Sequence, residues 1–195
     1  MPVGTGVRYL YAATYTADGS TVTYGEPFNI ARLVSASPEI ETGDDVKFYA
    51  DDALAENAGG IFTGGTLKCT VDGLADEIRV KITGAKKAEK NGVTVTVNSA
   101  SDETPYLGIG YVERFMDHGK TTFVPVFFPK GQFSPEVREA STQEDTIEFQ
   151  TLDIEASLMR DDTDEANWRY IGAGKTTAAE ALADLKKLMG ATEAA

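Results

Sequence analysis

The sequence predicts a mainly β fold: an antiparallel β-sandwich or barrel with one flanking α-helix and a second α-helix at the C-terminus. Three observations predict it. Apolar and polar residues alternate over many short runs, which is the period of a half-buried strand. Turn signals such as Asp-Gly and Asn-Gly separate several of these runs, as in β-hairpins. Only two stretches show apolar residues at the spacing of an amphipathic helix.

Composition limits the possible classes of protein. The chain has 195 residues, of which 42 % are hydrophobic and 25 % are charged, as in a soluble globular domain with a real core. Its net charge of −13 disfavours binding to nucleic acid or to an anionic membrane, because both require Lys and Arg. The first residues lack a signal peptide, and no apolar run reaches the roughly 20 residues that span a bilayer. We therefore expect neither secretion nor membrane insertion.

The first part of the chain reads as a hairpin and a third strand. Residues 7–15 and 21–30 are β-rich runs around the Asp-Gly turn of residues 17–20. Residues 33–41 form the third predicted strand. Pro38 would place part of that strand at a sheet edge, since proline donates no ladder hydrogen bond.

The central stretch is predicted as a strand, a long loop, a strand and a helix. Val46, Phe48 and Ala50 alternate with polar residues, and Leu67, Cys69 and Val71 do the same after the loop. The loop, residues 53–65, carries two Gly-Gly pairs and is longer than most connections, so we interpret it as a docking loop. The helix is predicted over residues 73–83. Its expected cap is Asp72, its apolar positions recur every four residues, and Gly84 ends it.

The second half adds further hairpins. Residues 86–92 are predicted as a polar loop with an Asn-Gly turn, followed by a strand over 93–97. Residues 105–116 and 121–133 flank the turn 117–120, and the second arm has apolar residues in both phases, which predicts cover on both of its faces. Residues 146–158 are a late strand with a predicted β-bulge at Gln150-Thr151.

The chain is predicted to divide at residue 160, into a β-sandwich domain (1–160) and an extension (161–195). The extension begins with an acidic linker, 161–165, and contains a flexible Gly172–Gly174 hinge. Thr177 and Glu180 form a capping box that opens an amphipathic helix ending at Gly190. Its docking residues are predicted to be Leu182, Leu185 and Leu188. The helix either packs on its own subunit, beside the first helix, or crosses to a neighbour.

The candidate catalytic and metal-binding residues all have simpler explanations. His118, the only histidine, lies in a turn, and Cys69, the only cysteine, lies on the apolar phase of a strand, which makes a zinc site improbable. Residues 172–177 resemble the end of a phosphate-binding loop, but Arg169 stands where that loop requires glycine. The acidic linker lacks the pattern of an EF-hand. We expect no enzyme activity, no cofactor and no metal.

Several segments together resemble the major tail protein family of bacteriophages with long non-contractile tails. The resemblance runs in order over roughly residues 5–160 and includes the late strand of residues 144–157. The other segments that carry it are Val22-Thr23-Tyr24-Gly25-Glu26-Pro27, Phe48-Tyr49-Ala50-Asp51-Asp52 and Gly64-Gly65-Thr66-Leu67.

This resemblance implies a structural virion protein. Its subunits would form hexameric rings that stack into a tail tube, with tape-measure, tail-tip and tail-terminator proteins as partners and DNA passing through the lumen without specific binding. The protein would reside in the host cytoplasm before assembly and in the virion afterwards. The predicted contacts between rings or subunits are Tyr49, Asp51, Asp52, Ile61 and Phe62.

An alternative from another class is an immunoglobulin-like or carbohydrate-binding surface module. In that reading, aromatic side chains on the surface would provide platforms for sugar rings. The candidate platforms are Tyr106, Tyr111 and Trp168. An enzyme is the third and weakest reading.

Overall fold

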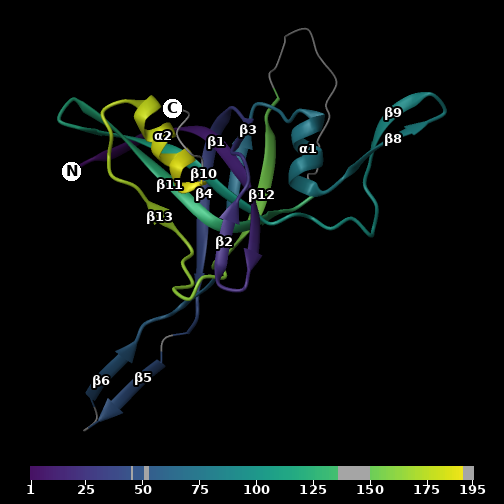
Figure 1. Ribbon diagram of the computed structural model, residues 1–195. Coiled ribbons are helices and arrows are strands. Elements are labelled where there is room, and N and C mark those ends of the chain that lie inside the picture. Colours follow the sequence, from purple (N-terminus) through teal and green to yellow (C-terminus); the bar gives the residue numbers. More distant parts are fainter. Residues whose placement is uncertain (45, 51–52, 136–149, 191–195) are drawn as a thin grey trace.

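A computed structural model describes residues 1–44, 46–50, 53–135 and 150–190, with residues 46–50 and 53–58 described by their backbone alone. The predicted fold class is confirmed: the chain is mainly β, with a large antiparallel sheet and a C-terminal helix (Figure 1). The main sheet contains β1 (Val3–Asp18), β2 (Thr21–Tyr24), β3 (Phe28–Ala31), β4 (Leu33–Thr42), β7 (Phe62–Val71), β10 (Leu107–Asp117), β11 (Lys120–Phe133), β12 (Leu152–Met159) and β13 (Tyr170–Ile171). Separate from it are β5 (Val46–Ala50), β6 (Ala53–Ala58), β8 (Lys86–Lys90), β9 (Val93–Val97), α1 (Asp76–Thr83) and α2 (Ala178–Leu188).

The main sheet closes on itself as a barrel. Its order is β2-β1-β10-β11-β12-β7-β4, and all of its pairings are antiparallel. β3 pairs with β1, while β4 pairs with β7, and only Arg32 separates β3 from β4. The segment 28–42 therefore pairs with β7 through β4 and with β1 through β3, and so links the two sides of the strand order. Closure of this kind satisfies backbone groups that an open sheet would leave at its edges.

The predicted hairpin turns are confirmed. Gly19 has φ 60° in the β1–β2 turn, and His118 and Gly119 have φ 47° and 80° in the β10–β11 turn. Asn91 and Gly92, at 54° and 78°, connect β8 to β9. In the β8–β9 and β10–β11 turns both central residues have positive φ, which gives a turn whose twist matches that of the flanking strands. The predicted polar loop over residues 86–92 is wrong in one respect, because residues 86–90 pair with β9 as a strand.

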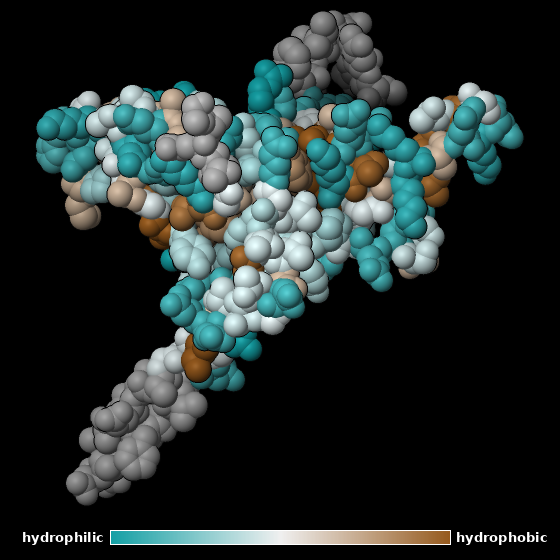
Figure 2. All heavy atoms as spheres, in the orientation of Figure 1, coloured by the Kyte–Doolittle hydropathy of each residue, from teal (hydrophilic) through white to brown (hydrophobic). Residues whose placement is uncertain are grey.

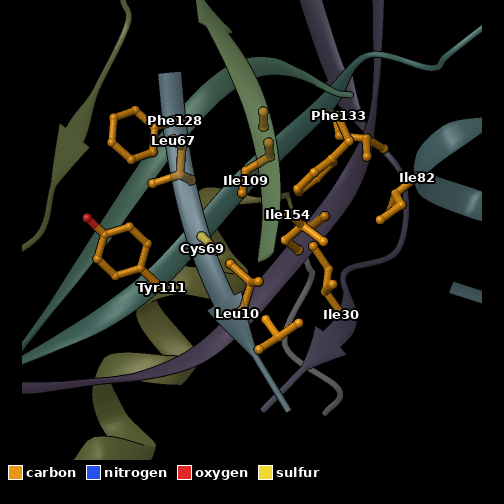
Figure 3. Packing of buried hydrophobic residues seen from close by; sticks show 14 of the residues in the cluster. Leu10, Ile30, Leu67, Cys69, Ile82, Ile109, Tyr111, Phe128, Phe133 and Ile154 are labelled. Atoms are coloured by element: carbon orange, nitrogen blue, oxygen red, sulfur yellow. The ribbon is translucent and has the colours of Figure 1, made fainter. Parts of the chain in front are cut away.

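The interior of the barrel holds the larger hydrophobic core (Figure 3). Leu67, Cys69 and Val71 of β7 point into it, as their alternation predicted. The other strands contribute side chains from their inward phase, among them Leu10, Ile109, Phe128 and Ile154. In β12, Ile154, Ala156 and Leu158 are buried, and the register with β7 is regular from Leu152 to Leu158. Gln150 and Thr151 precede that strand instead of forming the predicted bulge within it, and residues 146–149 lie outside the described residues.

Helix α1 covers one side of this core with Ile78 and Ile82. It ends as predicted, with Gly84 at φ 76° donating its N–H to the Val80 carbonyl. Its start differs from the prediction: the N-cap is Ala75, and no side chain caps the helix. The expected cap, Asp72, instead accepts hydrogen bonds from the backbone N–H and the Nε of Arg32. The Asp72 carboxylate, which the sequence pattern predicted as the N-cap of α1, thus pairs with Arg32 instead.

Helix α2 packs on the outer face of the sheet, over β10 and β11. The prediction that β11 is covered on both faces is confirmed, because Val126 and Phe128 face the barrel interior while Phe127 lies in the second cluster under α2. Gly110 in β10 makes room for the helix, because a Cβ there would lie 2.5 Å from Leu185 Cδ1. Of the two alternatives, α2 packs on its own chain. It does not lie beside α1 as predicted, because α1 packs against the core inside the barrel and α2 packs on the outer face.

The buried line of α2 runs at a spacing of four residues. The capping box of Thr177 and Glu180 is confirmed. Ala181, Leu185 and Met189 are fully buried, Leu182 is half-buried, and Leu188 is 36 % exposed. The prediction of burial is therefore wrong for Leu188, because side chains three and four residues apart share a face and Leu188 lies at the margin of that face.

The acidic segment 161–165 is a folded turn and not a solvated linker. Asp161 is only 5 % exposed, and its Oδ1 accepts hydrogen bonds from Thr163 N–H, Thr163 Oγ1 and Asn167 N–H. Asp162 accepts hydrogen bonds from Lys130 Nζ at 2.6 Å and from the Tyr15 hydroxyl at 2.7 Å. These bonds hold the pKa of Asp162 below its usual value, and burial raises the pKa of Tyr15 to about 12. The turn is thereby fixed to the barrel.

The Gly172–Gly174 segment is likewise not a hinge. It runs beside β11, where Gly172 N–H donates to the Pro125 carbonyl and Phe123 exchanges two backbone hydrogen bonds with Lys175. A Cβ on Gly172 would lie 2.6 Å from Pro125 Cγ, and one on Gly174 would lie 2.4 Å from Thr122 Cγ2. The glycines therefore permit close backbone approach, so residues 170–175 pair with β11 at the sheet.

Cys69 provides a probe of the core. Its side chain is buried, and burial raises the pKa of the thiol to about 12. Because the thiolate is the reactive form, we expect the native protein to resist alkylation at pH 8 and the urea-unfolded chain to react rapidly. Mass spectrometry after timed iodoacetamide treatment measures both rates. Rapid labelling of the native protein would contradict the burial of β7.

Candidate assembly surfaces

Two β-hairpins extend from opposite sides of the barrel (Figure 1). The first consists of β5 and β6, which pair from Val46 with Ala58 to Ala50 with Ala53. The second consists of β8 and β9, which pair from Lys86 with Val97 to Lys90 with Val93. Each hairpin is a two-stranded sheet of its own, separate from the barrel strands. Isolated two-stranded hairpins are marginally stable in water, so contact with a partner would stabilise each of these hairpins.

The β5–β6 hairpin corrects the prediction of a long loop over residues 53–65. Residues 53–58 form β6, and β7 already begins at Phe62. The base is closed by a hydrogen bond from Gly43 N–H to the Ile61 carbonyl, and a Cβ on Gly60 would lie 2.3 Å from the Gly43 oxygen. A Cβ on Gly65 would likewise lie 2.7 Å from the Glu39 oxygen. Gly60 and Gly65 therefore allow neighbouring backbone segments to approach closely, whereas the sequence analysis interpreted the Gly-Gly pairs as part of a flexible loop.

Of the predicted contact residues, the structure describes Tyr49 in this hairpin, Ile61 at its base and Phe62 at the start of β7. Tyr49 lies in β5 opposite Leu54, and Asp51 and Asp52 lie outside the described residues. Ile61 is 78 % exposed, and Figure 2 shows hydrophobic atoms where the hairpin joins the barrel. Ile61 therefore remains available as an anchor.

Phe62 is not a free anchor. Its ring stacks on Trp168 with the centroids 4.6 Å apart and the planes 4° from parallel. The guanidinium of Arg169 lies 4.6 Å from the Trp168 ring centre. The stack joins the start of β7 to the segment that follows the acidic turn, a contact between distant parts of the chain that no local pattern indicated.

The three aromatic side chains proposed as sugar platforms do not form a common surface. Tyr111 is 1 % exposed in the core, and Trp168 is stacked on Phe62. Tyr106 is exposed beside a polar cavity of about 510 Å³, but the Lys130 ammonium lies 4.8 Å from its ring centre. The structure therefore gives the carbohydrate-binding reading one candidate ring in place of three.

Titratable groups are dispersed in the described part of the chain. No three His, Cys, Asp or Glu side chains within it lie close enough to hold a metal ion together. His118 lies in its predicted turn, exposed, with Nδ1 2.6 Å from Asp117. Neither of the two described helices is long and apolar enough to cross a membrane. No protein-family model and no curated protein matches the chain.

Proposed function

We propose that the chain is a structural virion protein, the major tail protein of a bacteriophage with a long non-contractile tail. Its subunits form hexameric rings that stack into the tail tube. The tube encloses the tape-measure protein, is bounded by tail-tip and tail-terminator proteins, and conducts DNA at infection. In this proposal the chain has no catalytic role, and it passes from the host cytoplasm into the virion.

The observation that carries the proposal is the β5–β6 hairpin. It consists of two strands that pair only with each other, and it extends away from the barrel (Figure 1). Outward strand edges of such a hairpin are templates for pairing with another chain. A neighbouring subunit or ring provides that surface and also the stability that two strands alone do not reach. The exposed Ile61 at the base of the hairpin extends this contact onto the barrel.

The charge of the chain supports a conduit more than a DNA-binding surface. A lumen lined by part of the −13 carried by each subunit repels the phosphates of DNA. Repulsion of this kind lets the polymer slide through the tube, whereas a basic wall would hold it through released counterions.

We expect the purified protein to form rings and hollow tubes at high concentration, alone or on a tail-tip complex. The physical reason is mass action, because contacts between identical subunits form in proportion to protomer concentration. Sedimentation velocity measures the particle size, and negative-stain microscopy shows its shape. Monomers that persist at every concentration, and that never join a growing tail, would refute the proposal.

A further inference from the structure

The second hairpin, β8–β9, presents a face on which valines and lysines lie together. The register places Lys90 opposite Val93, Ala88 opposite Val95 and Lys86 opposite Val97. Paired residues share a face, so these six side chains lie on one side and Lys87, Glu89, Thr94 and Thr96 lie on the other. Val93 is 60 % exposed and Val97 is 42 % exposed. The hairpin thus exposes apolar side chains next to ammonium groups.

The charge of this hairpin is opposite to that of the rest of the chain. Three lysines and one glutamate give the segment 86–97 a net charge of +2. Because the whole chain carries −13, the remainder carries −15. Two such bodies repel each other at close range, and a basic element at their contact offsets that repulsion.

Contacts within the chain involve the base of the hairpin and leave its tip uncovered. Lys86 Nζ lies 3.6 Å from Asp102, and Lys87 Nζ lies 3.7 Å from Glu77 of α1. These ion pairs bring the lower part of β8 towards the barrel. Lys90, at the tip, makes no ion pair within the described part of the chain, and its neighbour Val93 is mostly exposed. The uncovered part of the face is therefore the end that reaches furthest outward.

We propose that the face formed by Lys86, Ala88, Lys90, Val93, Val95 and Val97 docks onto the acidic surface of a second copy of this chain. The inference rests on the proposed self-assembly and adds a contact distinct from the β5–β6 hairpin. The valines lose water on contact, and the lysines select an acidic partner over a basic or neutral one. The arrangement is heterologous, since a hairpin on one subunit meets a different surface on the next, as in rings and filaments.

The test compares two substitutions in adjacent positions of one strand. Val93→Asp places a carboxylate on the docking face, and Thr94→Asp places the same group on the opposite face, where residue 94 is also exposed. Sedimentation equilibrium of the full chain measures association. We expect Val93→Asp to lower the association constant about tenfold or more and Thr94→Asp to change it less than about threefold. Equal behaviour of the two variants, or a wild-type protein without self-association, would overturn the inference.

A charge reversal tests the acidic partner. Lys90→Glu is expected to weaken association about fivefold or more at low salt, and the difference from wild type should shrink as NaCl screens the charges. Wild-type dimers that never form tubes would reject the tube while keeping this contact, provided that Val93→Asp abolishes the dimer. Tubes that form equally from wild type and Val93→Asp would reject only this contact. If Lys90→Glu instead weakens binding of a DNA duplex in a filter-binding assay and leaves self-association unchanged, the hairpin contacts nucleic acid and the inference is wrong.

Discussion

Replacing Leu185 by Asp should lower the free energy of unfolding of the monomer by about 3 kcal/mol or more. Leu185 is fully buried between α2 and the outer face of the sheet, in a cluster with Val112, Phe127 and Met189. A carboxylate there loses its water without gaining a partner, and α2 also loses its central apolar contact. A helix of this length has little stability apart from such packing. Urea unfolding followed by circular dichroism measures the change.

Leu188→Asp is the matched control. It introduces the same carboxylate in the same helix, but Leu188 is 36 % exposed and lies at the margin of the buried face. We expect it to cost less than about 1 kcal/mol. Equal midpoints for the two variants would contradict the packing of α2. A Leu185→Asp monomer that melts like wild type but fails to assemble would show that the helix acts between subunits.

Replacing residues 44–60 by an Asn-Gly turn should abolish tube formation while leaving the barrel folded. Gly43 N–H already donates to the Ile61 carbonyl at 2.9 Å, and Thr42 already pairs with Phe62. A two-residue type I′ turn therefore connects β4 to β7 without moving either strand. Because β5 and β6 form a separate sheet, their loss should change the free energy of unfolding by less than about 1 kcal/mol. Thermal melting measures the barrel, and microscopy measures assembly.

The control introduces the same Asn-Gly turn at another position, so that any effect of the new turn itself can be separated from the loss of β5 and β6. Exchanging Gly19-Ser20 for Asn-Gly places the same dipeptide in the β1–β2 turn and keeps the hairpin of β5 and β6. That variant should assemble as wild type does. Normal tubes from the protein that lacks residues 44–60 would refute the role given to the β5–β6 hairpin, and an unfolded monomer would refute its independence from the barrel.

The sequence by itself determined the features that depend on a few neighbouring residues. The Asp-Gly, His-Gly and Asn-Gly turns lie where the sequence placed them, and their glycines all have positive φ, a conformation that glycine adopts without strain. The inward phase of β7 and the double cover of β11 follow from the period of two in a strand. The capping box before α2 is equally local, since its two partners are three residues apart.

Only the tertiary structure decided what the glycines and carboxylates do. Glycine has the same sequence signature whether it bends freely or admits a close neighbour, so Gly60, Gly172 and Gly174 read as flexible although each lies against another segment. Asp72 and Asp162 find partners that a local pattern does not contain: Asp72 pairs with Arg32, 40 residues away, and Asp162 accepts hydrogen bonds from Lys130 and Tyr15, 32 and 147 residues away. The face chosen by α2 depends on the space over Gly110, which exists only once β10 and β11 are paired. Contacts between distant segments are set by the packing of the whole chain, and for that reason they cannot be read from a short window of sequence.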